Sequence, residues 1–135
     1  MISNSINIYG LTKLRFLLNK YIFNPKLNEL LQLIQNETNV SVNSVDYLSH
    51  KFIICKDNEL DGNILIRHIC TIVCKFLSKY KLDIEVAIDT LEREDEKELV
   101  RQTLDQIIIG NHVHMIMNIM NLSNTEDKMT IMIQL

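Results

Sequence analysis

The sequence predicts an all-α protein, a bundle of six to eight helices around one central hydrophobic helix. Only one proline and three glycines interrupt the 135 residues, so residues that break helices are scarce. Along most of the chain, apolar side chains recur at spacings of three and four residues. Residues 63–80 are apolar around nearly the whole circumference but are short for a bilayer span, which places this helix at the centre of the bundle.

The bulk properties indicate a single domain, residues 1–135, with an ordinary apolar fraction of 47% and a charged fraction of 23%. A net charge of −3 without a basic block argues against nucleic acid as the main partner. We expect no signal peptide and no membrane-spanning segment, because the first residues are polar and no run of about 18 apolar residues occurs. Three cysteines without a Cys-x-x-Cys motif are expected to be buried, reduced side chains, with a redox or metal role as the alternative.

The first half of the chain predicts three helices. The first covers residues 9–22, and the second starts at Asn24-Pro25, a cap followed by a favourable first helical residue, and ends near Glu37. Residues 38–43 are polar and β-branched and predict a loop. Ser44 is expected to cap a third helix that extends to Cys55, and residues 56–62 a charged turn. Val45, Leu48 and Phe52 of this third helix should face inward, and Cys55 is a further candidate for that side.

The second half begins with the central helix, on which polar residues form one narrow stripe of Arg67, Thr71, Lys75 and Ser78. Asp83 is expected to cap the next helix, and the charged residues 92–98 to form a solvated face or a helix junction. A further helix should end at Gly110-Asn111, before a Met-rich helix over residues 112–122. Residues 123–128 predict a loop, and the apolar residues 129–135 a half-turn or a strand.

Little in the sequence indicates catalysis. His112 and His114 point apart on a helix and lack a third ligand nearby, so no metal is expected. His68 and Cys70 also diverge, and neither a Gly-rich phosphate loop nor a nucleophile elbow occurs. We therefore predict a protein that is not an enzyme and has no cofactor.

Arg67, on the first turns of the central helix, has two interpretations. It either extends toward solvent or pairs with Asp61 or Glu59, or it lies on the floor of a groove and receives an acidic residue of a ligand. A bidentate contact between guanidinium and carboxylate fixes the register of an amphipathic helix in an apolar groove.

The stretch around Arg67 resembles the first homology region of the Bcl-2 family, Asp-Gly-x-Asn-Trp-Gly-Arg, which precedes the central hydrophobic helix of that family. Asp61, Gly62 and Arg67 match, and Asn63 falls on the free position. Ile64, Leu65 and Ile66 stand where the family has Asn, Trp and Gly. The segment GNHVHMIMNIM (110–120) falls near the place of the second homology region, and the first helix at the place of the fourth. Such short versions are similar to those of large DNA viruses, iridoviruses or poxviruses.

The resemblance implies an inhibitor of apoptosis that sequesters pro-apoptotic Bcl-2 homology 3 helices, such as that of Bim, in a hydrophobic groove. It places the protein in the host cytoplasm, or at the periphery of mitochondria. The implied groove residues are Gly62, Arg67, Val45, Leu48, Phe52, Leu65, Ile66, Ile69 and Val73. The alternative is an adaptor of the same fold that intercepts innate-immune signalling proteins through another surface. An exposed apolar groove also predicts a homodimer that covers it.

Overall fold

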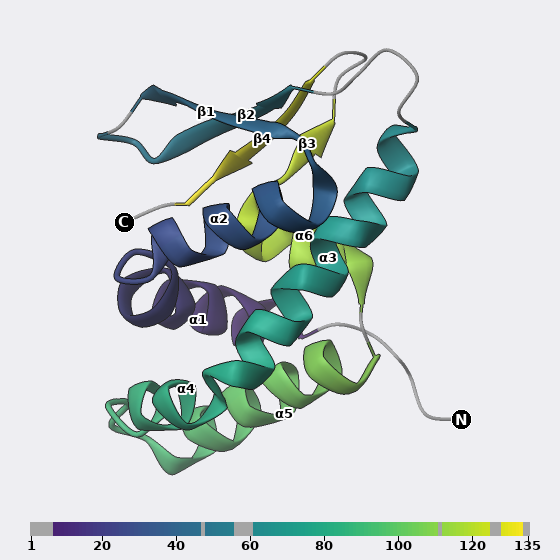
Figure 1. Ribbon diagram of the computed structural model, residues 1–135. Coiled ribbons are helices and arrows are strands. Elements are labelled where there is room, and N and C mark those ends of the chain that lie inside the picture. The colour runs from purple at the N-terminus through teal and green to yellow at the C-terminus, as the bar shows by residue number, and fades with distance from the viewer. Residues whose placement is uncertain (1–6, 47, 56–60, 111, 125–127, 134–135) are drawn as a thin grey trace.

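A computed structural model describes residues 7–46, 48–55, 61–110, 112–124 and 128–133. In these residues, helices alternate with two pairs of strands (Figure 1). The elements in chain order are α1 (Ile8–Leu18), the π-helix η1 (Asn19–Phe23), α2 (Leu27–Thr38), β1 (Ser41–Asp46), β2 (Lys51–Cys55), α3 (Gly62–Lys79), α4 (Lys81–Ile88), α5 (Glu94–Gly110), α6 (Val113–Met120), β3 (Ser123–Asn124) and β4 (Lys128–Met132).

The predicted all-α fold, a Bcl-2-like bundle of six to eight helices, is wrong. The four strands form one antiparallel sheet in the order β1-β2-β4-β3, which lies over the helices in Figure 1. The predicted third helix is instead the hairpin of β1 and β2, with Ser44 paired to Phe52. Of the two alternatives for residues 129–135, the strand is confirmed for the described part, where Phe52 pairs with Ile131.

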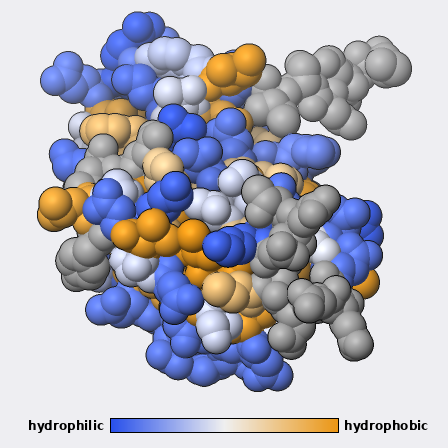
Figure 2. All heavy atoms as spheres, turned by 90° about the horizontal axis from the view of Figure 1, so that it is seen from above, coloured by the Kyte–Doolittle hydropathy of each residue, from blue (hydrophilic) through white to orange (hydrophobic). Residues whose placement is uncertain are grey.

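The strands form where apolar side chains alternate. Phe52 and Ile54 of β2 are buried, as are Met129 and Ile131 of β4, while the residues between them are half-exposed. A period of two places such side chains on one face of a sheet, which here packs on the helices. The opposite face is mixed in character, as Figure 2 shows from above the sheet.

The two N-terminal helices form where their leucine stripes predict helices, but α2 begins at Leu27, so the predicted start at Asn24-Pro25 is wrong. Asn7 caps α1 by accepting a hydrogen bond from the Gly10 N–H at 2.9 Å. Asn39 ends α2 in the left-handed conformation with φ 57°, which Asn tolerates better than most residues. Between α1 and α2, the chain forms the short π-helix η1.

Helix α3 runs across the whole molecule in Figure 1 and supplies much of the core. It is not surrounded by other elements as predicted, because one of its faces is exposed to solvent and carries Ile64, Arg67, His68 and Lys75. Its inward cysteines contact other helices, since the thiol of Cys70 lies 4.0 Å from the carbonyl oxygen of Val113. Burial, and to a smaller extent the charge of Cys74, raises the pKa of Cys70 to about 11.

Side-chain ion pairs join neighbouring helices at the surface. Arg101 of α5 donates to Glu85 at 2.9 Å and to Asp89 at 3.0 Å, which fixes α4 against α5. Glu29 of α2 accepts from Lys79 at 2.5 Å and from the hydroxyl of Tyr80. These two hydrogen bonds, first that of Lys79, lower the pKa of Glu29.

Helix α4 begins at Lys81, so Asp83 lies in its first turn and is not the predicted cap. Helix α5 ends at Gly110, which agrees with the predicted helical end at Gly110-Asn111. Among the described residues, no helix combines the length and apolar character needed to cross a bilayer.

Candidate functional site

The start of α3 is fixed by Asp61. Its carboxylate accepts a hydrogen bond from the Asn63 N–H at 2.9 Å, and its carbonyl accepts one from the Leu65 N–H at 3.1 Å. Asp61 is therefore the cap of the helix, and Asn63 lies within the first turn. Gly62 is the first helical residue.

Arg67 follows one turn later and is exposed. Within the described part of the chain, its guanidinium forms no ion pair or hydrogen bond, and the Asp61 carboxylate is directed to the backbone instead. The other predicted partner, Glu59, lies outside the described residues. The Arg67 carbonyl accepts a hydrogen bond from the Thr71 hydroxyl at 3.0 Å, which is a contact within the helix.

Arg67 lies at the edge of a cleft of about 500 Å³ between α3 and α6, which we call the α3/α6 cleft. Volumes of this size are typical of ligand pockets. Three apolar side chains, Ile66, Val113 and Met117, form its inner part. Its lining in full is Asn63, Ile66 and Arg67 from α3, and Val113, His114 and Met117 from α6.

The field in the α3/α6 cleft favours anions for two reasons. Arg67 supplies a full positive charge, and none of the lining residues is acidic. Helix α6 begins at the cleft with Val113, and no side chain caps its N-terminus at His112. The N-terminal ends of helices carry partial positive charge, so the dipole of α6 adds to the charge of Arg67. The N-terminal end of α3 does not contribute in the same way, because the Asp61 carboxylate caps it.

The structure separates the other residues predicted for the groove. Leu65, Ile69 and Val73 are buried in the core, as is Phe52 on β2, so none of them is open to a ligand in this state. Val45 and Leu48 are 54% and 85% exposed, but they lie at the turn of the β1–β2 hairpin. Figure 1 places this turn at the opposite end of the sheet from the start of α3. Only Ile66 and Arg67 of the predicted set line the α3/α6 cleft.

None of the three α6 residues that line the cleft was among the residues predicted for the groove. Val113, His114 and Met117 occupy positions i, i+1 and i+4 of a short helix, which places them on one side. Their signal is the Met-rich amphipathic pattern, because Met adapts to varied ligand shapes. His114 lines the cleft together with Val113 and Met117. No group of three His, Cys, Asp or Glu side chains suited to a metal ion occurs in the described ranges.

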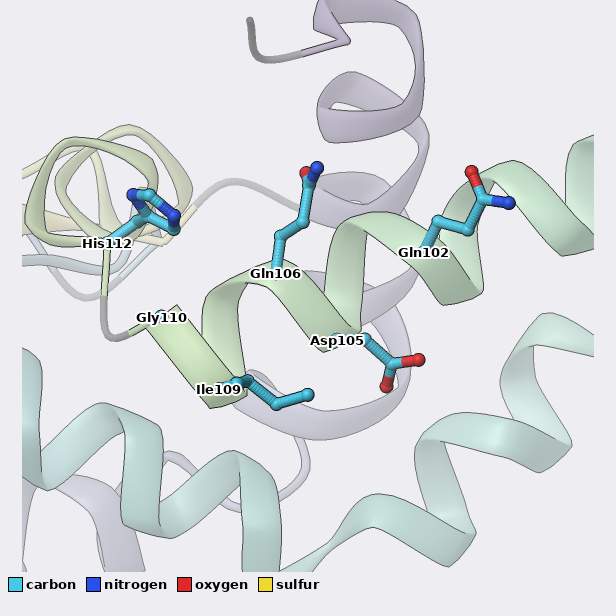
Figure 3. A pocket seen from close by; sticks show the side chains of 6 residues that line it. All are labelled: Gln102, Asp105, Gln106, Ile109, Gly110 and His112. Carbon is cyan, nitrogen blue, oxygen red and sulfur yellow. The ribbon is translucent and has the colours of Figure 1, made fainter. Parts of the chain in front are cut away.

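A second depression, of about 480 Å³, lies along the C-terminal half of α5 (Figure 3). All six residues that line it are exposed. Figure 3 shows Gln102 and Gln106 pointing to one side of α5, and Asp105 and Ile109 to the other. Because its polar groups do not converge on a common point, this depression is a weaker candidate than the α3/α6 cleft.

A third and smaller cleft, of about 190 Å³, lies between α2 and α3. Leu33, Ile72 and Phe76 are its apolar residues, and Glu37, Lys75 and Lys79 its charged ones. Here the charges are mixed, and Lys79 is already paired with Glu29.

Comparison of the chain with models of protein families, with curated proteins and with solved structures finds no match.

Proposed function

We propose that the protein is a binding protein that captures an amphipathic helix in the α3/α6 cleft, with Arg67 pairing with an acidic residue of that helix. The observation that carries the proposal is an arginine without a described acidic partner in a cleft that also presents the apolar side chains of Ile66, Val113 and Met117. Pro-apoptotic Bcl-2 homology 3 helices are ligands of this chemistry, since they combine apolar anchors with an acidic residue. Sequestering them would inhibit apoptosis, in the host cytoplasm or at mitochondria.

The proposal rests on the chemistry of the cleft and does not need an all-helical bundle. An amphipathic ligand would place apolar side chains against Ile66, Val113 and Met117. Its carboxylate would accept hydrogen bonds from Arg67 in a position partly shielded from water, where such charge-assisted contacts are strongest. Arg67 would then fix the register of the ligand, while the apolar contacts supply most of the affinity.

Titration of fluorescein-labelled pro-apoptotic helices by fluorescence polarisation tests the proposal. We expect at least one peptide to bind with a dissociation constant between about 1 nM and 10 μM, which corresponds to about 7–12 kcal/mol. Arg67→Ala should weaken binding by about 1–3 kcal/mol, or about 5- to 150-fold. No binding by any peptide at about 10 μM would reject the proposal.

Arg15→Ala is the matched control, because Arg15 lies on α1 and does not line the α3/α6 cleft. It removes the same charge from the protein and should leave the affinity unchanged. If both substitutions weaken binding equally, the effect comes from net charge, and the role given to Arg67 is wrong.

The second candidate is an adaptor that binds innate-immune signalling proteins through another surface. It is favoured by the outer side of α4, where Leu82 and Val86 are 83% and 67% exposed and one helical turn apart. For this function, Leu82→Ser should weaken binding to a panel of purified signalling domains, and Arg67→Ala should not. The opposite pattern of effects would exclude it.

We also propose a homodimer, since exposed apolar side chains of this kind favour self-association. Light scattering at high protein concentration is expected to give twice the mass of the chain. A monomer at every concentration would reject the dimer.

A further inference from the structure

One edge of the sheet is formed by a strand that has a partner on one side only among the described strands. Strand β1 (Ser41–Asp46) pairs with β2 and is the first strand in the order β1-β2-β4-β3. In an antiparallel ladder, the N–H and C=O groups of every second residue point away from the partner strand. We call this side of the strand the β1 edge, and it presents a row of backbone donors and acceptors.

The helices beneath the sheet leave the β1 edge accessible. Ser44 pairs with Phe52, whose side chain is buried against the helices, so the Ser44 side chain points to the same face. Ser44 is nevertheless exposed, as is every residue of β1 except the half-buried Val42. The helical layer therefore does not close over this strand, and a further strand can approach it from the side.

The β1 edge has few of the features that usually keep strands of different molecules from pairing. Proline, lysine, inward-pointing charges and bulges are common protections. The sequence SVNSVD contains no proline or lysine, and its one charged residue, Asp46, is the last. The one irregularity in its pairing with β2 lies between Ser44 and Asp46, which leaves Ser41–Ser44 regular. The opposite edge, β3 (Ser123–Asn124), has only two residues and is too short to accept a strand.

We infer that the homodimer forms by antiparallel pairing of the β1 edge with the β1 edge of a second copy, which joins two four-stranded sheets into one continuous sheet. The inference deepens the proposed homodimer and rests on it. About four to six main-chain hydrogen bonds would hold the two strands together. Because such a contact buries little apolar area, we expect a weak dimer with a dissociation constant of about 1–100 μM.

Two-fold symmetry restricts the register of this pair. The axis must be perpendicular to the sheet, because only this direction makes the two strands antiparallel in one sheet. Paired residues then point to the same face, so the axis passes beside a residue and not between two residues. Asn43 and Ser44 are the middle residues of β1, and Asn43 is the one farther from the irregularity.

An axis at Asn43 suits the chemistry of the strand. Asn43 of one copy then lies opposite Asn43 of the other, and a side-chain amide both donates and accepts hydrogen bonds. Val42 lies opposite Ser44, and Asp46 lies opposite Val40. The two acidic residues therefore stay apart, and no like charges oppose the pairing.

Charge substitutions at Asn43 test the pairing by analytical ultracentrifugation. Asn43→Lys brings two ammonium groups opposite each other and should raise the dissociation constant of the dimer by about 5-fold or more. Asn43→Glu alone should have the same effect. An equimolar mixture of the two variants should dimerise at least as tightly as the unchanged protein, because each mixed pair places an ammonium opposite a carboxylate. Asn124→Lys is the matched control, since Asn124 is an exposed residue of the opposite edge, and should leave the dimer unchanged.

A disulfide at the same position gives a positive test. The Cα atoms of directly opposite residues are about 4.5–5.5 Å apart, a separation that a disulfide can bridge. Cys55→Ser is needed as the background, because the Cys55 thiol is exposed and lies 3.6 Å from the side-chain nitrogen of Asn43. In that background, Asn43→Cys treated with oxidised glutathione should give a covalent dimer on a non-reducing gel, whereas Asn124→Cys should not.

The outcomes separate this inference from the proposals on which it builds. It is overturned if the dimer forms but Asn43→Lys leaves its dissociation constant unchanged, or if the mixture fails to restore what each variant loses. The homodimer then uses another surface. A monomer at every concentration rejects the homodimer and the inference together. Capture of a helix is judged by its own titration, because none of the residues that line the α3/α6 cleft belongs to β1. Circular dichroism of each variant shows that a lost dimer is not a lost fold.

Discussion

Substitution of Gly10 by alanine should destabilise the fold through a single close contact between α1 and α5. A Cβ atom at Gly10 would lie 2.6 Å from the Thr103 hydroxyl oxygen and 3.1 Å from Leu99 Cγ. The first distance is well inside van der Waals contact. Thr103 cannot easily move, because it is buried and its hydroxyl donates to the Leu99 carbonyl at 2.9 Å. Overpacking of this kind costs about 1–3 kcal/mol, which the better helix propensity of alanine offsets by about 1 kcal/mol.

A double-mutant cycle isolates the contact from the propensity. In a Thr103→Ala background the hydroxyl is gone, and the nearest atom to the new Cβ is Leu99 Cγ at 3.1 Å. Gly10→Ala should then be neutral or stabilising by up to about 1 kcal/mol, which gives a coupling of about 1–2 kcal/mol between the two sites. Urea unfolding followed by circular dichroism measures all four free energies.

Gly110→Ala is the matched control for this cycle. Its Cβ would also come within 2.6 Å of a neighbour, but that neighbour is the ring of His112, which is exposed and can turn away. We expect a change below about 0.5 kcal/mol. The reasoning is refuted if the coupling between the α1 and α5 sites is below about 0.3 kcal/mol, or if the control costs as much as Gly10→Ala.

Three further predictions concern other parts of the molecule. The hydrogen bond from Lys79 lowers the pKa of Glu29 in the folded protein, so ionised Glu29 should stabilise the fold above about pH 4.5, and this stabilisation should be lost as the pH falls further. Glu29→Gln should make the free energy of unfolding, measured by urea titration, less dependent on pH in the acid range. Cys55 is exposed, whereas the pKa of Cys70 is raised to about 11, so a thiol reagent at pH 8 should modify Cys55 rapidly and both α3 thiols only after unfolding. Ile54→Ala should lower the free energy of unfolding by about 2–5 kcal/mol, since this side chain is buried between the sheet and the helices. Ile53→Ala, on the outer face of the sheet, should lower it by less than about 1 kcal/mol. Equal losses would contradict the assignment of the two faces.

The helices could be predicted from sequence because their signal is local. The leucine stripe of α1 and the apolar pattern of α3 both repeat at the helical period and are long enough to be unambiguous. The hairpin was missed because β1 is a polar edge strand, with the sequence SVNSVD, and carries little hydrophobic alternation of its own. Its partner β2 is stabilised by β4, which lies far away in the sequence, and no local pattern reveals that pairing.

The candidate site was predictable in part. Arg67 could be found because it is a charged residue on a largely apolar helix, and because Asp61, which caps that helix, precedes it by less than two turns. The partners of Arg67 across the cleft could not be found in the same way, because Val113 and Met117 are brought to it only by the packing of α6 on α3. The hairpin also carries Leu48 away from this region, which a third helix would not have done.

The order of strands in the sheet has a consequence for how the chain folds. Each of the helices α1 to α6 can form from its own local hydrogen bonds, although α1 packs on the distant α5, whereas β2 must wait for β4, which follows all of the helices in the sequence. Until β4 pairs with it, β2 has an unpaired edge. We therefore expect the closing of the sheet to be the slow step of folding, and a species with formed helices and an open hairpin to be the one most prone to aggregate.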